Sequence, residues 1–150
     1  MAELEGLYQE LILDHAKRPR NFGALAGANR RAEGFNRLCG DRLTLWVRLE
    51  DNVVRDLRFE GSGCAISTAS ASLLTEALKG KTAAEAEELF RRFHALVTGD
   101  FTAAGDPDEL GKLAAFSGVS EFPVRVKCAS LAWHTFAAAL HGADAPVSTE

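Results

Sequence analysis

The residues of this chain best suited to chemistry are three cysteines and one aspartate: Cys39, Asp41, Cys64 and Cys128. Cys39 and Asp41 flank Gly40 in an expected loop just before a strand, so both side chains can reach the same ion. A thiolate and a carboxylate at this spacing are suitable ligands for one metal.

The settings of the other two cysteines also favour ionised thiols. Cys64 follows Gly61-Ser62-Gly63 at an expected junction between a strand and a helix, where unpaired N–H groups and the helix dipole favour a thiolate. Cys128 follows Arg125 and Lys127 near the start of the last expected helix, so two cations lie beside it. All three thiols are therefore candidate soft ligands.

Together, three thiolates and Asp41 make a closed four-coordinate zinc site or a cradle for an iron–sulfur cluster, because soft thiolates suit both. Residue types alone do not separate these two. The alternative is that each cysteine is a buried, inert side chain, the commonest role of a single free thiol. We favour the metal site because two of the cysteines lie beside glycines in loops, where functional residues concentrate. An odd number of cysteines without a C-x-x-C pair does not indicate a disulfide framework.

Hydrophobic periodicity predicts an α+β fold that places these residues at the ends of elements. Alternating apolar residues predict two strands between Leu43 and Phe59, joined by a tight turn at Asp51-Asn52, and a weaker third strand over 31–35. Helical spacing and capping signals predict about five helices: 4–15, Ala65–Lys79, one after the capping box Thr82–Glu85, a short one from Pro107, and Phe122–His141. We expect a small three-stranded antiparallel sheet packed with these helices, a mobile insertion over 99–106 and a frayed tail over the last eight residues.

The composition fits one globular domain over residues 1–150. With 47% apolar residues, the chain can build a sizeable core without disulfides. The net charge of −4 argues against nucleic-acid binding, which relies on broad positive charge. The acidic first residues lack the pattern of a secretory signal, and no apolar run nears the ~20 residues that span a bilayer. We expect a cytoplasmic protein with neither nucleic-acid nor membrane partners.

The remaining polar and aromatic candidates have structural interpretations. His94, His134 and His141 fall within or at the end of expected helices, where packing or a dipole interaction explains them. His15 lies at a helix end beside a basic turn, and we expect it to be structural or part of a docking surface rather than a metal ligand. The two tryptophans are expected in the core.

These same segments resemble the IscU/NifU-like family of iron–sulfur cluster assembly proteins, and within it the SufU branch. The resemblance runs over nearly the whole chain and is carried by Tyr8–His15 with Pro19–Gly23, Cys39–Asp41, Gly61–Ser67, Phe122–Cys128 and a SufU-type insertion at Thr98–Val119. Lys127 stands where IscU-type scaffolds carry a histidine, and lysine is a poor metal ligand, which favours the SufU branch. Arg37 departs from the family, which often has a proline there.

The resemblance implies a SufE/NifU-like fold with zinc bound by Cys39, Asp41, Cys64 and Cys128, or alternatively an iron–sulfur cluster held by the three cysteines. It also implies that Cys39 is the catalytic residue, which accepts persulfide sulfur from a PLP-dependent cysteine desulfurase. Whether this makes the chain a sulfurtransferase enzyme stays open. The alternative function is a scaffold that assembles a cluster and passes it to acceptor proteins. Two further alternatives are an interaction module with a purely structural zinc and a cysteine hydrolase, for which no histidine has an evident pairing position.

Overall fold

The computed structural model describes residues 2–142 and 145–149, with side chains from residue 8 onward. Within these ranges the chain forms, in order, α1 (Ala2–Lys17), β1 (Arg30–Asn36), β2 (Asp41–Glu50), β3 (Val53–Ser62), α2 (Ala65–Leu78), α3 (Ala83–Thr98), α4 (Phe101–Ala104), α5 (Pro107–Leu110), the 3-10 helix η1 (Gly111–Glu121), α6 (Pro123–Leu140) and β4 (Val147–Ser148). The α+β class is as predicted. Of the helices in these ranges, none is both long enough and apolar enough to cross a bilayer.

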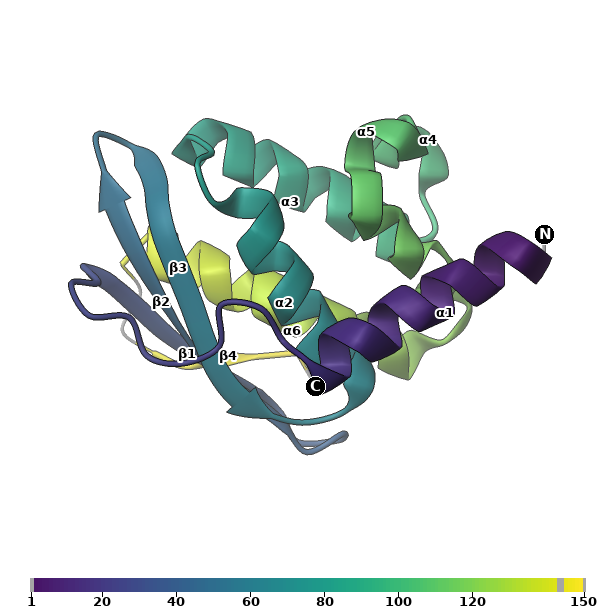
Figure 1. Cartoon of the computed structure of the whole chain (residues 1–150), viewed down its shortest axis with the longest axis horizontal. Coiled ribbons are helices and arrows are strands. Elements are labelled where there is room, and N and C mark those ends of the chain that lie inside the picture. The colour runs from purple at the N-terminus through teal and green to yellow at the C-terminus, as the bar shows by residue number, and fades with distance from the viewer. Residues whose placement is uncertain (1, 143–144, 150) are drawn as a thin grey trace.

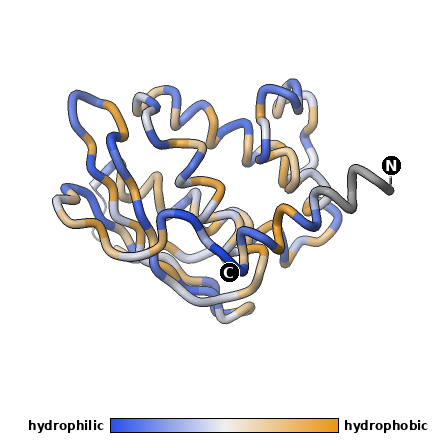
Figure 2. Tube along the Cα trace, viewed as in Figure 1, coloured by the Kyte–Doolittle hydropathy of each residue, from blue (hydrophilic) through white to orange (hydrophobic). Residues whose placement is uncertain are grey.

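The β2–β3 hairpin follows from the alternating pattern of its sequence. Leu45 and Val47 are fully buried and point to one face, whereas their neighbours along the strand point to the other. Figure 2 shows the resulting alternation of apolar and polar residues along the strands. Asp51 and Asn52 both have positive φ angles, as a tight hairpin turn between right-twisted strands requires. The two predicted strands and their turn are confirmed.

Strand β1 confirms the prediction of a third strand over 31–35, and the glycine within it has a packing role. β1 pairs antiparallel with β2, in a register that places Asn36 opposite Asp41. A Cβ on Gly34 would overlap the side chain of Thr135 on α6 and approach Leu131 Cδ1 to 3.1 Å. Glycine therefore permits the close approach of α6 to the sheet, which is why it interrupts an otherwise strand-like sequence.

The sheet has one more strand than predicted. Its order is β3-β2-β1-β4, and β4 pairs with β1 in parallel, which makes the sheet mixed rather than purely antiparallel. The prediction of a frayed tail is therefore wrong for Val147 and Ser148, whereas residues 143, 144 and 150 lie outside the described ranges. Thr149 anchors the short strand, because its N–H donates to the Phe35 carbonyl and its hydroxyl to the Lys127 carbonyl. A two-residue strand held by backbone contacts has no periodic pattern to reveal it.

The helices cover one side of the sheet (Figure 1). α6 packs across β1 and β2, and α2 packs against β3 and α6. Between α3 and α6, the Trp133 indole stacks on Phe93 with ring centroids 4.5 Å apart, and both side chains are fully buried. The prediction that Trp133 lies in the core is confirmed, whereas Trp46 on β2 is only half-buried.

The region between α3 and α6 contains more helix than predicted. α3 begins with the predicted capping box, in which Thr82 and Glu85 each accept a hydrogen bond from the other's backbone N–H. The expected mobile insertion over 99–106 contains α4, capped by the Asp100 carboxylate, which accepts the Ala103 N–H. The short helix from Pro107 is followed by η1, so the described ranges hold six α-helices rather than about five. A four-residue helix is too short to show a 3.6-residue period.

Candidate metal centre

The β1–β2 connection presents Cys39 and Asp41. Residues 37–40 form the loop between the strands, and Gly40 has a φ angle of +69°, a conformation that other residues rarely adopt. Asp41 is the first residue of β2 and is buried, whereas Cys39 in the loop is half-buried. The sequence prediction of a loop before a strand is confirmed for Cys39, whereas Asp41 already belongs to the strand.

Cys64 is the N-cap of α2, as the strand–helix junction predicts. Its Sγ accepts the Ser67 N–H at 3.5 Å, and its own N–H donates to Asp41 Oδ1 at 2.8 Å. The thiol lies 3.8 Å from Asp41 Oδ2. A Cβ on Gly63 would lie 3.0 Å from Asp41 Cα, so glycine at this position lets the β3–α2 junction approach β2 closely.

The last helix, α6, places Cys128 beside Cys39 and Asp41. It lies in the second turn of α6, its side chain is buried, and its Sγ is 3.1 Å from Cys39 Sγ. Three ligand atoms, one each from Cys39, Asp41 and Cys128, all lie within 4.8 Å of one another. Cys64 is not part of this tight group but contacts it through Asp41 and the Cys128 thiol. The structure thus gathers all four predicted ligands, three closely and the fourth at their edge.

Burial dominates the electrostatics of this cluster. Burial, followed by the hydrogen bonds of its thiol with Cys39 and Asp41, raises the pKa of Cys128 far above its usual range, because a thiolate there has no compensating charge. Asp41 is 2% exposed and makes no ion pair within the described residues. Arg125 and Lys127, the two cations expected beside Cys128, form no ion pair with Asp41 in the part of the chain that the structure describes, and the Arg125 guanidinium lies 4.4 Å above the Phe122 ring.

Asn36 is a residue of this site that the sequence analysis did not identify. Its side chain is fully buried at the end of β1, with Nδ2 4.0 Å from Cys128 Sγ. Its Oδ1 accepts the Leu38 N–H at 3.1 Å, which shapes the turn that carries Cys39. An asparagine directly before a turn was the available signal, although its contact with Cys128 depends on tertiary packing.

The histidines lie away from the cluster. His94 on α3 and His134 on α6 pack edge to face against Phe90, and His141 pairs with Glu87 at 3.3 Å. Burial, with a smaller contribution from His94, lowers the pKa of His134. His15 is fully buried between α1 and α2. These contacts fit structural roles, and none of the four histidines has a ligand atom in the described metal-binding group.

Comparison with known proteins finds relatives over most of the chain. A Bacillus subtilis relative named zinc-dependent sulfurtransferase SufU is 42% identical over 132 residues, covering 88% of each chain. The Thermotoga maritima protein named iron–sulfur cluster assembly scaffold protein IscU is 39% identical over 140 residues, covering 93% of this chain and 96% of that one. The crystal structure of FiSufU from Fervidobacterium islandicum aligns with a TM-score of 0.82 and 36% identity, over 91% of this chain and 98% of that chain.

The family match covers every candidate ligand. Residues 7–138 match the NifU-like N terminal domain, a range that includes the β1–β2 loop, the β3–α2 junction and the first turns of α6. The resemblance stated from sequence motifs is therefore confirmed over most of the chain. This chain belongs to the family of NifU-like N-terminal domains.

Proposed function

We propose that this protein is a zinc-dependent sulfur acceptor in iron–sulfur cluster assembly, which takes persulfide sulfur on Cys39 from a cysteine desulfurase. The observation that carries the proposal is the gathering of three thiols and a buried carboxylate from three distant segments of the chain. The similarity to a zinc-dependent sulfurtransferase of Bacillus subtilis supports it.

The donor set fits zinc. Three thiols and one carboxylate match the ligand number and softness of a closed zinc site, with Cys39, Asp41, Cys64 and Cys128 as the proposed ligands. Asp41 is buried without an ion pair in the described residues, which is costly unless a cation compensates it. When bound, zinc supplies a positive charge that keeps the coordinating thiols deprotonated.

Cys39 is the thiol that we propose accepts sulfur. It is half-buried in the 37–40 loop beside the exposed Leu38, whereas Cys64, also half-buried, caps α2 and Cys128 is buried. In the proposed transfer, the Cys39 thiolate attacks the outer sulfur of the partner's persulfide. A new S–S bond forms at Cys39 Sγ while the partner's S–S bond breaks, and the partner's cysteine leaves as a thiolate, so no external oxidant or reductant is needed.

The surroundings of Cys39 suit docking of the desulfurase. Leu38, next to Cys39, is 66% exposed, and the side chains of Phe122 and Val124 at the start of α6 are also exposed. Exposed apolar side chains beside a reactive group are typical of interaction sites. We infer a single domain over residues 1–150 that works in the cytoplasm, where thiols remain reduced.

The test compares Cys39→Ala and Asp41→Ala with wild type and with Asp108→Ala, an exposed carboxylate on α5 that serves as a matched control. Zinc content and stimulation of a cysteine desulfurase are measured anaerobically. We expect one zinc per wild-type chain, loss of stimulation in both site variants, and no change in the control. Undiminished stimulation by Cys39→Ala would refute the sulfur-acceptor role. Unfolding of the whole chain on zinc removal, without any effect on desulfurase turnover, would favour a purely structural zinc.

A cluster scaffold is the second candidate, because the Thermotoga maritima relative is named as one. Cys39, Cys64 and Cys128 would then hold a cluster in transit. Anaerobic reconstitution with iron and sulfide, followed by transfer to an apo-ferredoxin, separates the two candidates. Intact transfer with no influence on desulfurase turnover would establish the scaffold.

A further inference from the structure

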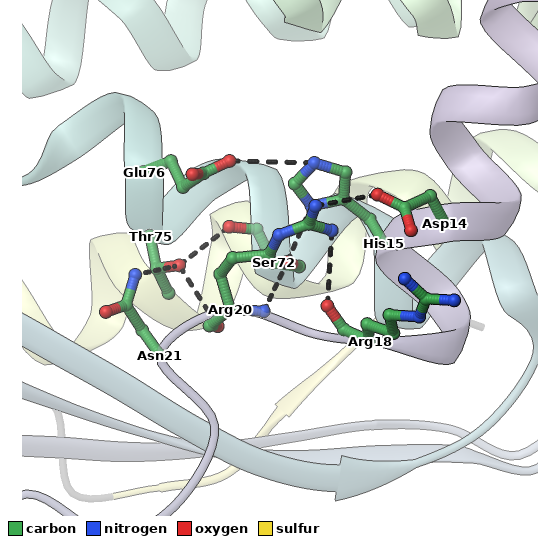
Figure 3. Close-up of polar contacts among 8 residues, drawn as sticks. All are labelled: Asp14, His15, Arg18, Arg20, Asn21, Ser72, Thr75 and Glu76. Carbon is green, nitrogen blue, oxygen red and sulfur yellow. Dashed lines mark hydrogen bonds and ion pairs between the residues drawn. The ribbon is translucent and has the colours of Figure 1, made fainter.

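A hydrogen-bond network centred on His15 ties the end of α1 and the following turn to α2 (Figure 3). The His15 ring is fully buried, and its Nδ1 lies 2.7 Å from Ser72 Oγ. Ser72 Oγ also accepts the Arg20 N–H at 2.9 Å. The basic turn 17–20 is therefore hydrogen-bonded, through the Arg20 backbone, to the buried face of α2.

The Ser72 hydroxyl suits a neutral His15 ring. Ser72 Oγ accepts the Arg20 N–H, and its own hydrogen can point at His15 Nδ1, in which case Nδ1 is the unprotonated ring nitrogen. Burial first, and then the positive charge of Arg20, lowers the pKa of His15 and keeps the ring neutral. The remaining charged groups that act on the ring are Glu76, Lys112 and Asp14.

The network is not a hydrolase site, although it contains serine, histidine and glutamate. Ser72 is fully buried, so no substrate can reach its hydroxyl. His15 Nε2 lies 3.6 Å from Glu76 Oε1, which is longer than a hydrogen bond. The role of the network is therefore to hold structural elements in position.

The segment after α1 also forms hydrogen bonds with β3. Asn21 donates its side-chain N–H to Thr75 Oγ1 on α2, and its backbone carbonyl accepts the Phe59 N–H of β3 at 3.1 Å. Gly23 donates its N–H to the Phe59 carbonyl at 2.8 Å, and the rings of Phe22 and Phe59 pack edge to face. We call residues 14–23 the brace, because they bond both to α2 and to β3.

The two elements that the brace joins are the two that flank Cys64. β3 ends at Ser62 and α2 begins at Ala65, so the angle between them sets where the Cys64 thiol lies relative to Asp41. We propose that His15 is a positioning residue for Cys64: through Ser72 and the brace, it holds α2 and β3 in the arrangement that brings the thiol to the metal-binding group. Residues outside the ligand set that fix ligand orientation commonly control metal affinity.

Two substitutions of His15 test this inference, which rests on the proposed zinc site for one of its two readouts. His15→Leu fills the space without an acceptor, whereas His15→Asn keeps an acceptor oxygen near the position of Nδ1. Phe116→Leu is the control, because Phe116 is fully buried against Phe93 of α3 and takes no part in the hydrogen bonds of the brace, so its truncation lowers stability by a core defect. Thr75→Val is a milder variant, which removes the Asn21 contact if His15→Leu does not fold.

The first readout is zinc affinity by competition with a chromophoric chelator, at a temperature where circular dichroism shows each apo-protein folded. The second is the rate at which iodoacetamide alkylates Cys64 relative to Cys39 in the apo-protein, followed by peptide mass spectrometry. We expect His15→Leu and Thr75→Val to lose about tenfold in zinc affinity and to shift the alkylation ratio several-fold, with His15→Asn recovering most of both.

Wild-type behaviour of His15→Leu in both readouts would overturn the inference, as would equal changes in Phe116→Leu, which would show a general loss of stability. If wild type binds no zinc, the proposed function fails, and the alkylation ratio still decides whether the brace positions Cys64.

Discussion

Because the β3–α2 junction approaches β2 closely, we predict that Gly63→Ala lowers both the stability of the apo-protein and its zinc affinity. A Cβ at this position would lie 3.0 Å from both Cα and Cγ of Asp41 and would overlap Oδ1. Because the Asp41 backbone is paired in the sheet, the strain cannot be relieved by side-chain rotation alone. The carboxylate must move away from the Cys64 N–H, which now donates to it at 2.8 Å.

The size of the effect follows from this hydrogen bond. A bond to a charged acceptor contributes about 1.5–3 kcal/mol, and its loss leaves a buried carboxylate with fewer partners. For a chain of this length, about 2 kcal/mol corresponds to a fall of about 4–8 °C in melting temperature. Displacement of Asp41 also disturbs the group of three ligand atoms, so zinc affinity falls with it.

Thermal unfolding of the apo-protein by circular dichroism and zinc competition measure these two effects. The control is Gly118→Ala in η1, where an added Cβ meets no atom within 4 Å, and we expect its melting temperature to change little. A Gly63→Ala protein with the melting temperature and zinc affinity of wild type would refute the close-approach argument.

Two further predictions concern the packing of the sheet and the protonation of His15. Gly34→Ala forces a Cβ against Thr135 and Leu131, and we expect urea unfolding to show a loss of about 1–3 kcal/mol from overpacking. For His15, the folded-state pKa lies below its ordinary value of 6.5, so the unfolded chain binds more protons as pH falls below 6.5 and stability is lost as pH falls toward the folded-state pKa. Urea unfolding at about pH 7.5 and about pH 5.5 should show a smaller loss for His15→Asn than for wild type, and equal losses would contradict the neutral buried ring.

The elements with long, regular patterns could be predicted from the sequence. The alternation in β2 and β3, and the capping box before α3, act locally, so the residues themselves reveal them. The strand β4 and the helix α4 could not be predicted, because each is shorter than one period of its pattern and is held by contacts with distant residues, such as that of Thr149 with Phe35.

The candidate site was predictable in its residues but not in its geometry. Glycines and element boundaries next to Cys39 and Cys64 were visible in the sequence, and family motifs joined them to Cys128. The contact of Asn36 with Cys128 joins residues that are 92 positions apart, and no local signal encodes it. The brace was hidden for the same reason, because His15 and Ser72 are 57 positions apart.

The 89-residue separation of Cys39 and Cys128 has a consequence for the life of this protein in the cell. Because the loop between them closes only when α6 packs across the sheet, a nascent chain without α6 has no complete ligand set. We therefore expect zinc loading to follow folding, and bound zinc to stabilise the native state by mass action. On the proposed zinc site, a cell starved of zinc would hold a larger share of its copies in the less stable apo-form, which quality-control proteases degrade more readily. Zinc supply would thus set the steady-state amount of this protein.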